Sequence, residues 1–238
     1  ASVGLSYGAH SNLCVNQIKL NGSPEQKAKY LPGLCAGTAV GALAMSEEGA
    51  GSDPAALRAY AVPTGDRYDL RGEKAWVTNG PAASVFILFA RTSPPDTNEK
   101  PRITAFVAER KDGVRSTAPE RKLGVRGNGT SDVTFDGVSL SKEAVLAEPG
   151  RGFKVAMEVL NEGRLILAAG AVGIAKRIVR LCTARVQDRR AFGRSIGEFG
   201  LVKDKIATMV AEIYAVESAT YLTTGLADAR SHDYAVES

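Results

Sequence analysis

Three short segments of the chain carry residue types that could bind a flat, phosphate-bearing ligand. Ser46–Asp53 joins serine hydroxyls to glycines, and a glycine-rich turn lets backbone N–H groups approach a ligand because no side chain obstructs them. Trp76, the only tryptophan, supplies a flat ring two residues before the hydroxyl of Thr78. Arg189 can bind a pyrophosphate by charge-assisted hydrogen bonds while Phe192 packs on a ring.

Each segment also has a purely structural interpretation. Ser46–Asp53 is compatible with an ordinary loop, Trp76 with a core position in a barrel, and Arg189 with an exposed basic residue at a helix terminus. The residues alone leave these alternatives open.

The composition narrows the class of protein. The chain has 238 residues, of which 44% are hydrophobic, enough for a core and for more than one lobe. Its 30 basic and 26 acidic residues are spread along the chain, so we expect no nucleic-acid partner. No apolar run approaches the roughly 20 residues that span a bilayer, so we expect no transmembrane segment. The chain begins with Ala1 rather than Met and stops at Ser238, from which we expect an internal piece of a longer protein.

The cysteines and histidines argue against a metal site. Cys14, Cys35 and Cys182 lie far apart in the sequence and are interpreted as reduced residues of an intracellular protein. With only two histidines, the chain has no Cys/His cluster at metal-ligand spacing, and we expect no metal.

Helical and strand patterns divide the chain into three parts. Residues 1–40 are predicted to be helical, because Ser23 can cap a helix that starts at Pro24 and Gln26 completes a capping box. Residues 41–150 alternate short apolar runs with turn residues, which predicts an antiparallel sheet or barrel. The candidate strands are 41–46, 67–70, 73–78, 84–90, 102–109 and 131–137.

Residues 151–238 change to helical periodicity. Apolar side chains recur there at alternating steps of four and three residues, which predicts one buried stripe of a bundle helix. The residues of this stripe are Val202, Ile206, Met209, Ile213 and Val216. Two such helices cannot close a four-helix core, so the region is interpreted as the first part of a larger bundle.

The predicted fold class is therefore α+β. We expect the end of a helical N-terminal domain in residues 1–40 and a middle antiparallel β-barrel domain in residues 41–150. Residues 151–238 are predicted to begin a C-terminal four-helix bundle that is truncated here.

The three ligand-binding segments, taken in this order, resemble the flavin motifs of the acyl-CoA dehydrogenase family. The matching stretches are 43–53, 74–80 and 188–193. Further similarity to the family's middle and C-terminal domains lies in 124–127, 135–138, 152–157 and 161–164. The resemblance covers residues 2–238 and departs from the family pattern at Glu48, where proline is usual.

This resemblance implies FAD as the cofactor. The residues implied in FAD binding are Leu43, Met45, Ser46, Gly51, Ser52, Trp76, Thr78, Arg189 and Phe192. Trp76 would cover the flavin, and Thr78 would bond near its N5 atom. Arg189 and Phe192 would reach FAD in a neighbouring subunit, which implies a homodimer or homotetramer. The residues implied in acyl-CoA binding are Ser52, Asn161 and Arg164.

The implied activity is α,β-dehydrogenation of an acyl-CoA thioester, with electrons passed to an electron-transfer flavoprotein. A carboxylate must remove the α-proton, and most family members carry it late in the C-terminal domain, which implies a base beyond Ser238. A minority carry a glutamate at the position of Gly163 here. Glu162 lies one residue earlier, about 100° round the helix, and is interpreted as a helix-start or tunnel-rim residue instead.

The resemblance leaves subfamily and activity open. Residues 2–18 and Asn79–Pro81 are similar to the isovaleryl-CoA branch, whereas 152–164 and 199–201 are similar to the very-long-chain branch. Medium or long acyl chains are favoured, because Gly163 leaves room. The implied location is the mitochondrial matrix for a eukaryotic protein and the cytoplasm for a bacterial one. A non-catalytic assembly protein on the same fold and an acyl-CoA oxidase are the alternative functions.

Overall fold

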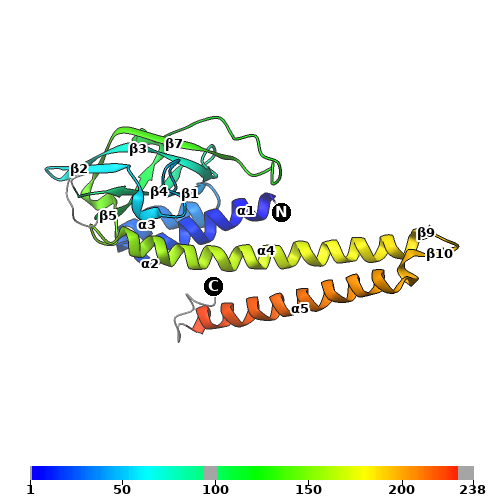
Figure 1. Cartoon of the computed structure of the whole chain (residues 1–238). Helices are drawn as coiled ribbons and strands as arrows, with labels where there is room; N and C mark the ends of the chain where they lie inside the picture. Colours follow the sequence, from blue (N-terminus) through cyan, green and yellow to red (C-terminus); the bar gives the residue numbers. More distant parts are fainter. Residues whose placement is uncertain (1, 94–100, 230–238) are drawn as a thin grey trace. The chain divides into compact units, whose positions relative to one another are not determined.

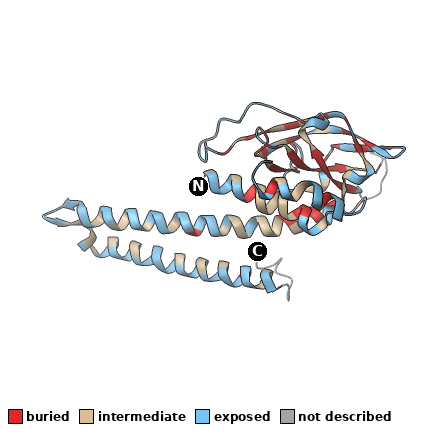
Figure 2. Ribbon diagram, turned by 180° about the vertical axis from the view of Figure 1, so that it is seen from behind, coloured by how far each residue is buried: buried red, intermediate tan, exposed pale blue. Residues whose placement is uncertain are grey.

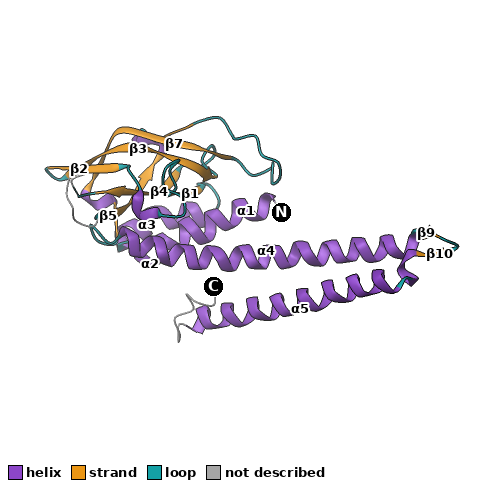
Figure 3. Cartoon of the chain, in the orientation of Figure 1, coloured by secondary structure: helices purple, strands orange, loops and turns teal. Residues whose placement is uncertain are grey.

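The computed structural model describes residues 2–93 and 101–229, which fall into two compact units (Figure 1). The first unit is Ser2–Gly163, and the second begins at Arg164. The first contains helices and a sheet, whereas the described part of the second consists of long helices joined by a short hairpin (Figure 3). The predicted combination of α and β structure is thus confirmed.

Four helical segments open the chain. They are α1 (Ser2–Gly8), the π-helix η1 (Ala9–Val15), α2 (Asn16–Asn21) and α3 (Pro24–Cys35). The predicted capping box of α3 is confirmed, because Gln26 N donates to Ser23 Oγ at 3.2 Å and Ser23 N donates to Gln26 Oε1 at 3.1 Å. Pro24 lies in the first turn, where its missing N–H leaves no helical hydrogen bond unmade.

One sheet of eight strands forms the centre of the first unit. The strands are β1 (Gly41–Ala44), β2 (Tyr60–Thr64), β3 (Arg67–Thr78), β4 (Val85–Arg91), β5 (Ile103–Glu109), β6 (Arg115–Ser116), β7 (Thr130–Ser141) and β8 (Val145–Leu146). Their order is β6-β7-β3-β2-β4-β5-β8, and β1 pairs with β4.

The sheet differs from the predicted antiparallel barrel in two respects. β1 and β2 run parallel to β4, so the sheet combines parallel and antiparallel pairs. A long connection leads from each of these two strands to β4, as parallel pairing requires. The hydrogen-bonded path runs from β6 to β8 without returning on itself among the described residues. Both end strands have only two residues, which is too short a ladder to close a barrel.

The strand predictions also needed correction in detail. The candidates 67–70 and 73–78 belong to a single strand, β3, and β2 was not predicted at all. β2 contains Pro63, and a proline inside an apolar run argues against a strand in a sequence.

The core of the first unit lies on both faces of the sheet, where buried residues gather (Figure 2). β4 illustrates this arrangement, because Phe86 and Leu88 pack in one hydrophobic cluster while Ile87 and Phe89 pack in the other. Helical residues such as Ile18 join only the second cluster, so the helices cover one face. Each such fully buried side chain contributes about 1.5–3 kcal/mol of hydrophobic stabilisation.

The second unit is much more exposed. It comprises most of α4 (Gly152–Asp188), the hairpin strands β9 (Arg190–Ala191) and β10 (Arg194–Ser195), the short η5 (Ile196–Glu198) and α5 (Gly200–Ala229). The predicted buried stripe of α5 is only partly covered, because Met209 and Val216 stay 36% and 51% exposed. Within the described residues, neither α4 nor α5 has a stretch apolar and long enough to cross a membrane.

Candidate functional site

A buried ion pair fixes the loop that follows β1. Glu47 Oε1 accepts from Lys74 Nζ at 2.7 Å and from the backbone of Ala59 at 3.0 Å, and Glu47 Oε2 accepts from Arg58 N at 2.6 Å. The Lys74 side chain, on β3, is fully buried and also donates to Met45 O at 3.2 Å. The loop is therefore tied to β3 and to the segment before β2.

Each member of this pair favours the charged form of the other. Burial raises the pKa of Glu47, but the Lys74 ammonium and the hydrogen bonds to the carboxylate outweigh it, so this pKa lies below its ordinary value. Burial lowers the pKa of Lys74, and the Glu47 carboxylate opposes that shift. Three hydrogen bonds hold the Glu47 carboxylate, which makes it an anchor for the loop.

A β-bulge brings Trp76 to the same loop. The register between β3 and β7 slips between the pairs Lys74–Val133 and Val77–Ser131, so Ala75 and Trp76 lie opposite a single residue of β7. Ala75 N donates to Ser46 O at 2.8 Å, which joins the bulge to the loop. A β-bulge changes the direction in which its side chains point.

Trp76 is presented to solvent in an unusual backbone conformation. Its φ is 56°, in the left-handed region, and its side chain is 57% exposed. A bulky residue in this region costs about 1–3 kcal/mol and persists only where the surroundings enforce it. Such strain is concentrated at functional sites, so the exposed indole is a candidate ligand contact.

The other residues predicted for this part of the site lie close by in the same elements. Leu43 is in β1, while Met45 and Ser46 follow it in the loop, all half-buried. Gly51 and Ser52 are exposed, and a Cβ added at Gly51 would meet nothing within 4 Å. Thr78 ends β3 and is paired with Thr130 of β7.

A hollow of 510 Å³ lies beside the bulge. Of the residues predicted from the sequence, only Trp76 lines it, together with side chains such as Glu48 and Asp132. The loop and the bulge thus offer a flat exposed ring, hydroxyl groups and open glycine backbone at one junction, which suits a planar ligand.

Arg189 and Phe192 belong to the second unit. Arg189 follows the end of α4, and its N–H donates to Arg185 O at 2.9 Å. Phe192 lies between β9 and β10 with φ 54°, and it is 92% exposed. Both side chains are therefore available at the hairpin for contact with a ligand or another chain.

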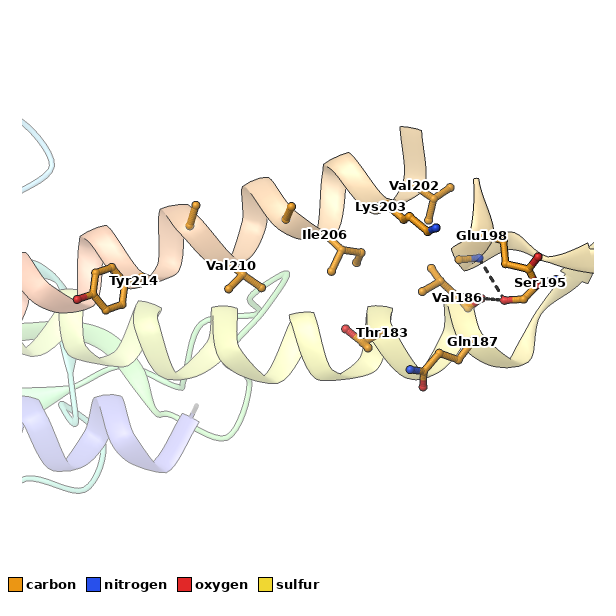
Figure 4. Close-up of a pocket in the computed structure, with 13 residues that line it drawn as sticks. Thr183, Val186, Gln187, Ser195, Glu198, Val202, Lys203, Ile206, Val210 and Tyr214 are labelled. Atoms are coloured by element: carbon orange, nitrogen blue, oxygen red, sulfur yellow. Dashed lines mark hydrogen bonds between the residues drawn. The ribbon is translucent and has the colours of Figure 1, made fainter. Parts of the chain in front are cut away.

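A larger hollow of 990 Å³ lies between α4 and α5 (Figure 4). Its surface is mostly apolar and includes Val186, Ile206 and Val210, which Figure 4 labels. Ser195 Oγ donates to Val186 O at 2.6 Å and so fastens the hairpin to α4. Neither Arg189 nor Phe192 lines this hollow.

Two of the residues predicted to meet the substrate, Asn161 and Arg164, lie in α4, whereas Ser52 lies in the loop after β1. Asn161 is half-buried and Arg164 is exposed. Glu162 accepts a hydrogen bond from Asn16 Nδ2 of α2, so its carboxylate is already engaged. A Cβ added at Gly163 would come within 3.1 Å of Leu13 Cδ2, so a larger residue there would require Leu13 to move.

Sequence reasoning missed two residues that build the site. Lys74 had a detectable signal, because strict alternation from Tyr68 and Leu70 places it on the inner face of β3, where a lysine needs a carboxylate. Asp132 had none, because its place opposite the bulge depends on a register slip that no local pattern encodes.

Comparison with known proteins identifies the family. Models of the acyl-CoA dehydrogenase N-terminal, middle and C-terminal domains match residues 1–38, 42–138 and 150–237. The chain is 41% identical to the very long-chain specific acyl-CoA dehydrogenase of Bos taurus over 99% of its length, and 44% identical to the isovaleryl-CoA dehydrogenase of Solanum tuberosum over 92%. It spans only 37% and 53% of these mitochondrial relatives.

Solved structures agree with this result. Butyryl-CoA dehydrogenase from Megasphaera elsdenii is similar with a TM-score of 0.93 and 32% identity, covering 99% of this chain and 61% of that one. An acyl-CoA dehydrogenase from Bacillus anthracis, described in complex with FAD, has a TM-score of 0.86 and 37% identity, covering 93% of this chain and 38% of that one. The chain belongs to the acyl-CoA dehydrogenase family of FAD-dependent flavoproteins.

Proposed function

We propose that this chain is part of an enzyme that uses FAD to form the α,β-double bond of an acyl-CoA thioester. One observation carries the proposal: the Ser46 loop and the Trp76 bulge, which match the family's flavin motifs, are joined by the hydrogen bond from Ala75 N to Ser46 O. The domain limits 1–40, 41–150 and 151–238 are part of the proposal, and the limits of the three matching family models support them.

The residues present suit an isoalloxazine ring. Trp76 offers an exposed flat surface, Ser46 and Thr78 offer hydroxyls, and the glycine backbone at Gly51 is open to close approach. We assign Leu43 to Ser46 to the pyrimidine side of the ring and Ser52 to the junction of cofactor and substrate. When bound, FAD supplies an acceptor for the hydride that leaves the β-carbon.

Residues of the second unit are proposed to complete the binding of FAD in a neighbouring subunit. The exposure of Arg189 and Phe192 at the β9–β10 hairpin supports this assignment, because a guanidinium and a ring suit the pyrophosphate and adenine of a dinucleotide. The proposal implies a homodimer or homotetramer. Asn161 and Arg164 are proposed to contact the acyl-CoA.

The proposed base lies beyond Ser238. Two carboxylates of the matching stretches are already engaged, Glu47 by Lys74 and Glu162 by Asn16, which argues against both as proton acceptors. A free, desolvated carboxylate has its pKa raised toward neutrality and is the more effective base.

Substrate, partner and location rest on the relatives alone. Long-chain and branched-chain acyl-CoA thioesters both fit the names of the two groups of relatives. An electron-transfer flavoprotein is proposed as the electron acceptor because the resemblance to the family implies it. The mitochondrial matrix is proposed for a eukaryotic source, as the relatives' names suggest, and the cytoplasm for a bacterial one.

The function is tested with purified full-length protein under anaerobic conditions. Acyl-CoA thioesters of short, long and branched chains are added in turn, and bleaching of the flavin absorption band is followed. We expect bleaching with at least one chain length. Bound FAD that no thioester bleaches would favour the assembly protein, and peroxide formation without an added flavoprotein acceptor would indicate an oxidase.

A further inference from the structure

The bulge in β3 leaves two backbone N–H groups that the β7 ladder cannot satisfy in the usual way. One belongs to Ala75 and donates to Ser46 O of the loop at 2.8 Å. The other belongs to Trp76 and donates to the carboxylate Oδ1 of Asp132 at 3.3 Å. A side chain of β7 thus replaces the backbone partner at the point where Trp76 adopts a positive φ.

Asp132 is itself held firmly in place. Its N–H donates to Thr117 Oγ1 at 3.1 Å, and its carbonyl oxygen accepts from Thr117 N at 3.1 Å. Because both backbone groups of Asp132 are hydrogen-bonded to Thr117, its carboxylate is anchored opposite the bulge. Asp132 and Trp76 also line the same hollow.

We propose that Asp132 is a positioning residue, which holds the Trp76 backbone in its left-handed conformation and so presents the indole to the flavin. The proposal rests on the proposed function and adds a residue that acts through the Trp76 backbone. Its physical basis is that a strained conformation requires specific contacts, and the side-chain oxygen of Asp132 supplies the acceptor that the Trp76 N–H needs.

The test reads the indole of Trp76, the only tryptophan of these 238 residues. Any tryptophan elsewhere in the full-length protein is first replaced by phenylalanine. In protein freed of FAD, the fluorescence anisotropy of the indole and its quenching by acrylamide report how firmly Trp76 is held. We expect Asp132→Val to lower the anisotropy and increase quenching, because valine suits a strand but accepts no hydrogen bond. Asp132→Asn retains an acceptor oxygen and should stay close to the wild type.

Asp136→Val is the matched control, since Asp136 lies on the same strand, is exposed and pairs with Arg71 instead. It should leave the indole signals unchanged. FAD titration of the same variants should show the dissociation constant about tenfold higher for Asp132→Val and near the wild-type value for the other two.

Two outcomes would contradict the proposal. Indole signals of Asp132→Val that match the wild type would overturn it, as would an Asp132→Asn variant that behaves like Asp132→Val. If Asp132→Val does not fold, as judged by circular dichroism, Asp132→Ala takes its place in the same comparison. If no protein, including the wild type, binds FAD, the proposed function fails, while the signals of the cofactor-free proteins still decide the role of Asp132.

Discussion

At the scale of single residues, the position of the loop after β1 depends on the buried carboxylate of Glu47, which pairs with the ammonium group of Lys74. Glu47 is 7% exposed and the Lys74 side chain is fully buried. Such a pair adds little net stability compared with an apolar pair, but loss of one member leaves an uncompensated charge in the interior. The pair therefore determines where Ser46 and the bulge meet.

Replacement of Lys74 by methionine should lower the free energy of unfolding by about 3–5 kcal/mol, because the Glu47 carboxylate stays buried without its partner. Urea denaturation measures the change. Lys111→Met is the matched control, since Lys111 pairs with Glu109 at the surface with its side chain 72% exposed, and it should cost less than about 1 kcal/mol. Equal effects of the two substitutions would contradict the burial argument.

The same pair predicts how stability depends on acid. The pKa of Glu47 is lower in the folded protein than its usual value of 4.5, so the unfolded chain binds more protons in acid. The contribution of Glu47 is therefore fully present above this value and is lost as the pH falls through the lower, folded pKa. Unfolding measured between about pH 3 and 6 should show a shallower acid limb for Glu47→Gln than for the wild type. An unchanged slope would mean that Glu47 has the same affinity for protons in both states.

At the scale of elements, the capping box of α3 could be predicted because its signal is local, a serine followed three residues later by glutamine. The strand β4 was also predictable, because its run of apolar residues is continuous. The parallel pairing of β1 and β2 with β4 was not, since it joins segments far apart in the chain. For the same reason the flavin motifs were recognisable one by one, but the bulge that joins them through Ala75 was not.

Substitution of two phenylalanines tests how much a buried strand and an exposed hairpin contribute to stability. Phe89 in β4 is fully buried, so Phe89→Ala should destabilise the protein by about 3–5 kcal/mol. Phe192 at the β9–β10 hairpin is 92% exposed, so Phe192→Ala should change stability by less than about 0.5 kcal/mol, although it removes a proposed FAD contact. Chemical denaturation of both variants measures the difference. A large loss of stability in Phe192→Ala would place that ring in a core instead.

At the scale of the whole molecule, the two units differ in how much they bury. The first has clusters on both faces of its sheet, whereas in α5 only Thr223 is buried among the described residues. Regions with few buried apolar contacts open at a low free energy cost.

Hydrogen exchange should therefore separate the two units. Amides of β4 are expected to exchange only through global unfolding, while amides of α5 exchange faster through local opening. Mass spectrometry of peptides from 85–91 and 200–229 measures both. Protection of α5 that equals that of β4 at all protein concentrations would show that the helix is covered by a stable partner.

The most direct test of the central claim is a titration of the cofactor-free protein with FAD, followed by the emission of Trp76. Saturable binding with one FAD per chain and strong quenching of the Trp76 indole are expected, because the proposed site places the ring of the cofactor against Trp76, the only tryptophan of these 238 residues. A protein that stays colourless, or that binds FAD while the emission of Trp76 is unchanged, would contradict it.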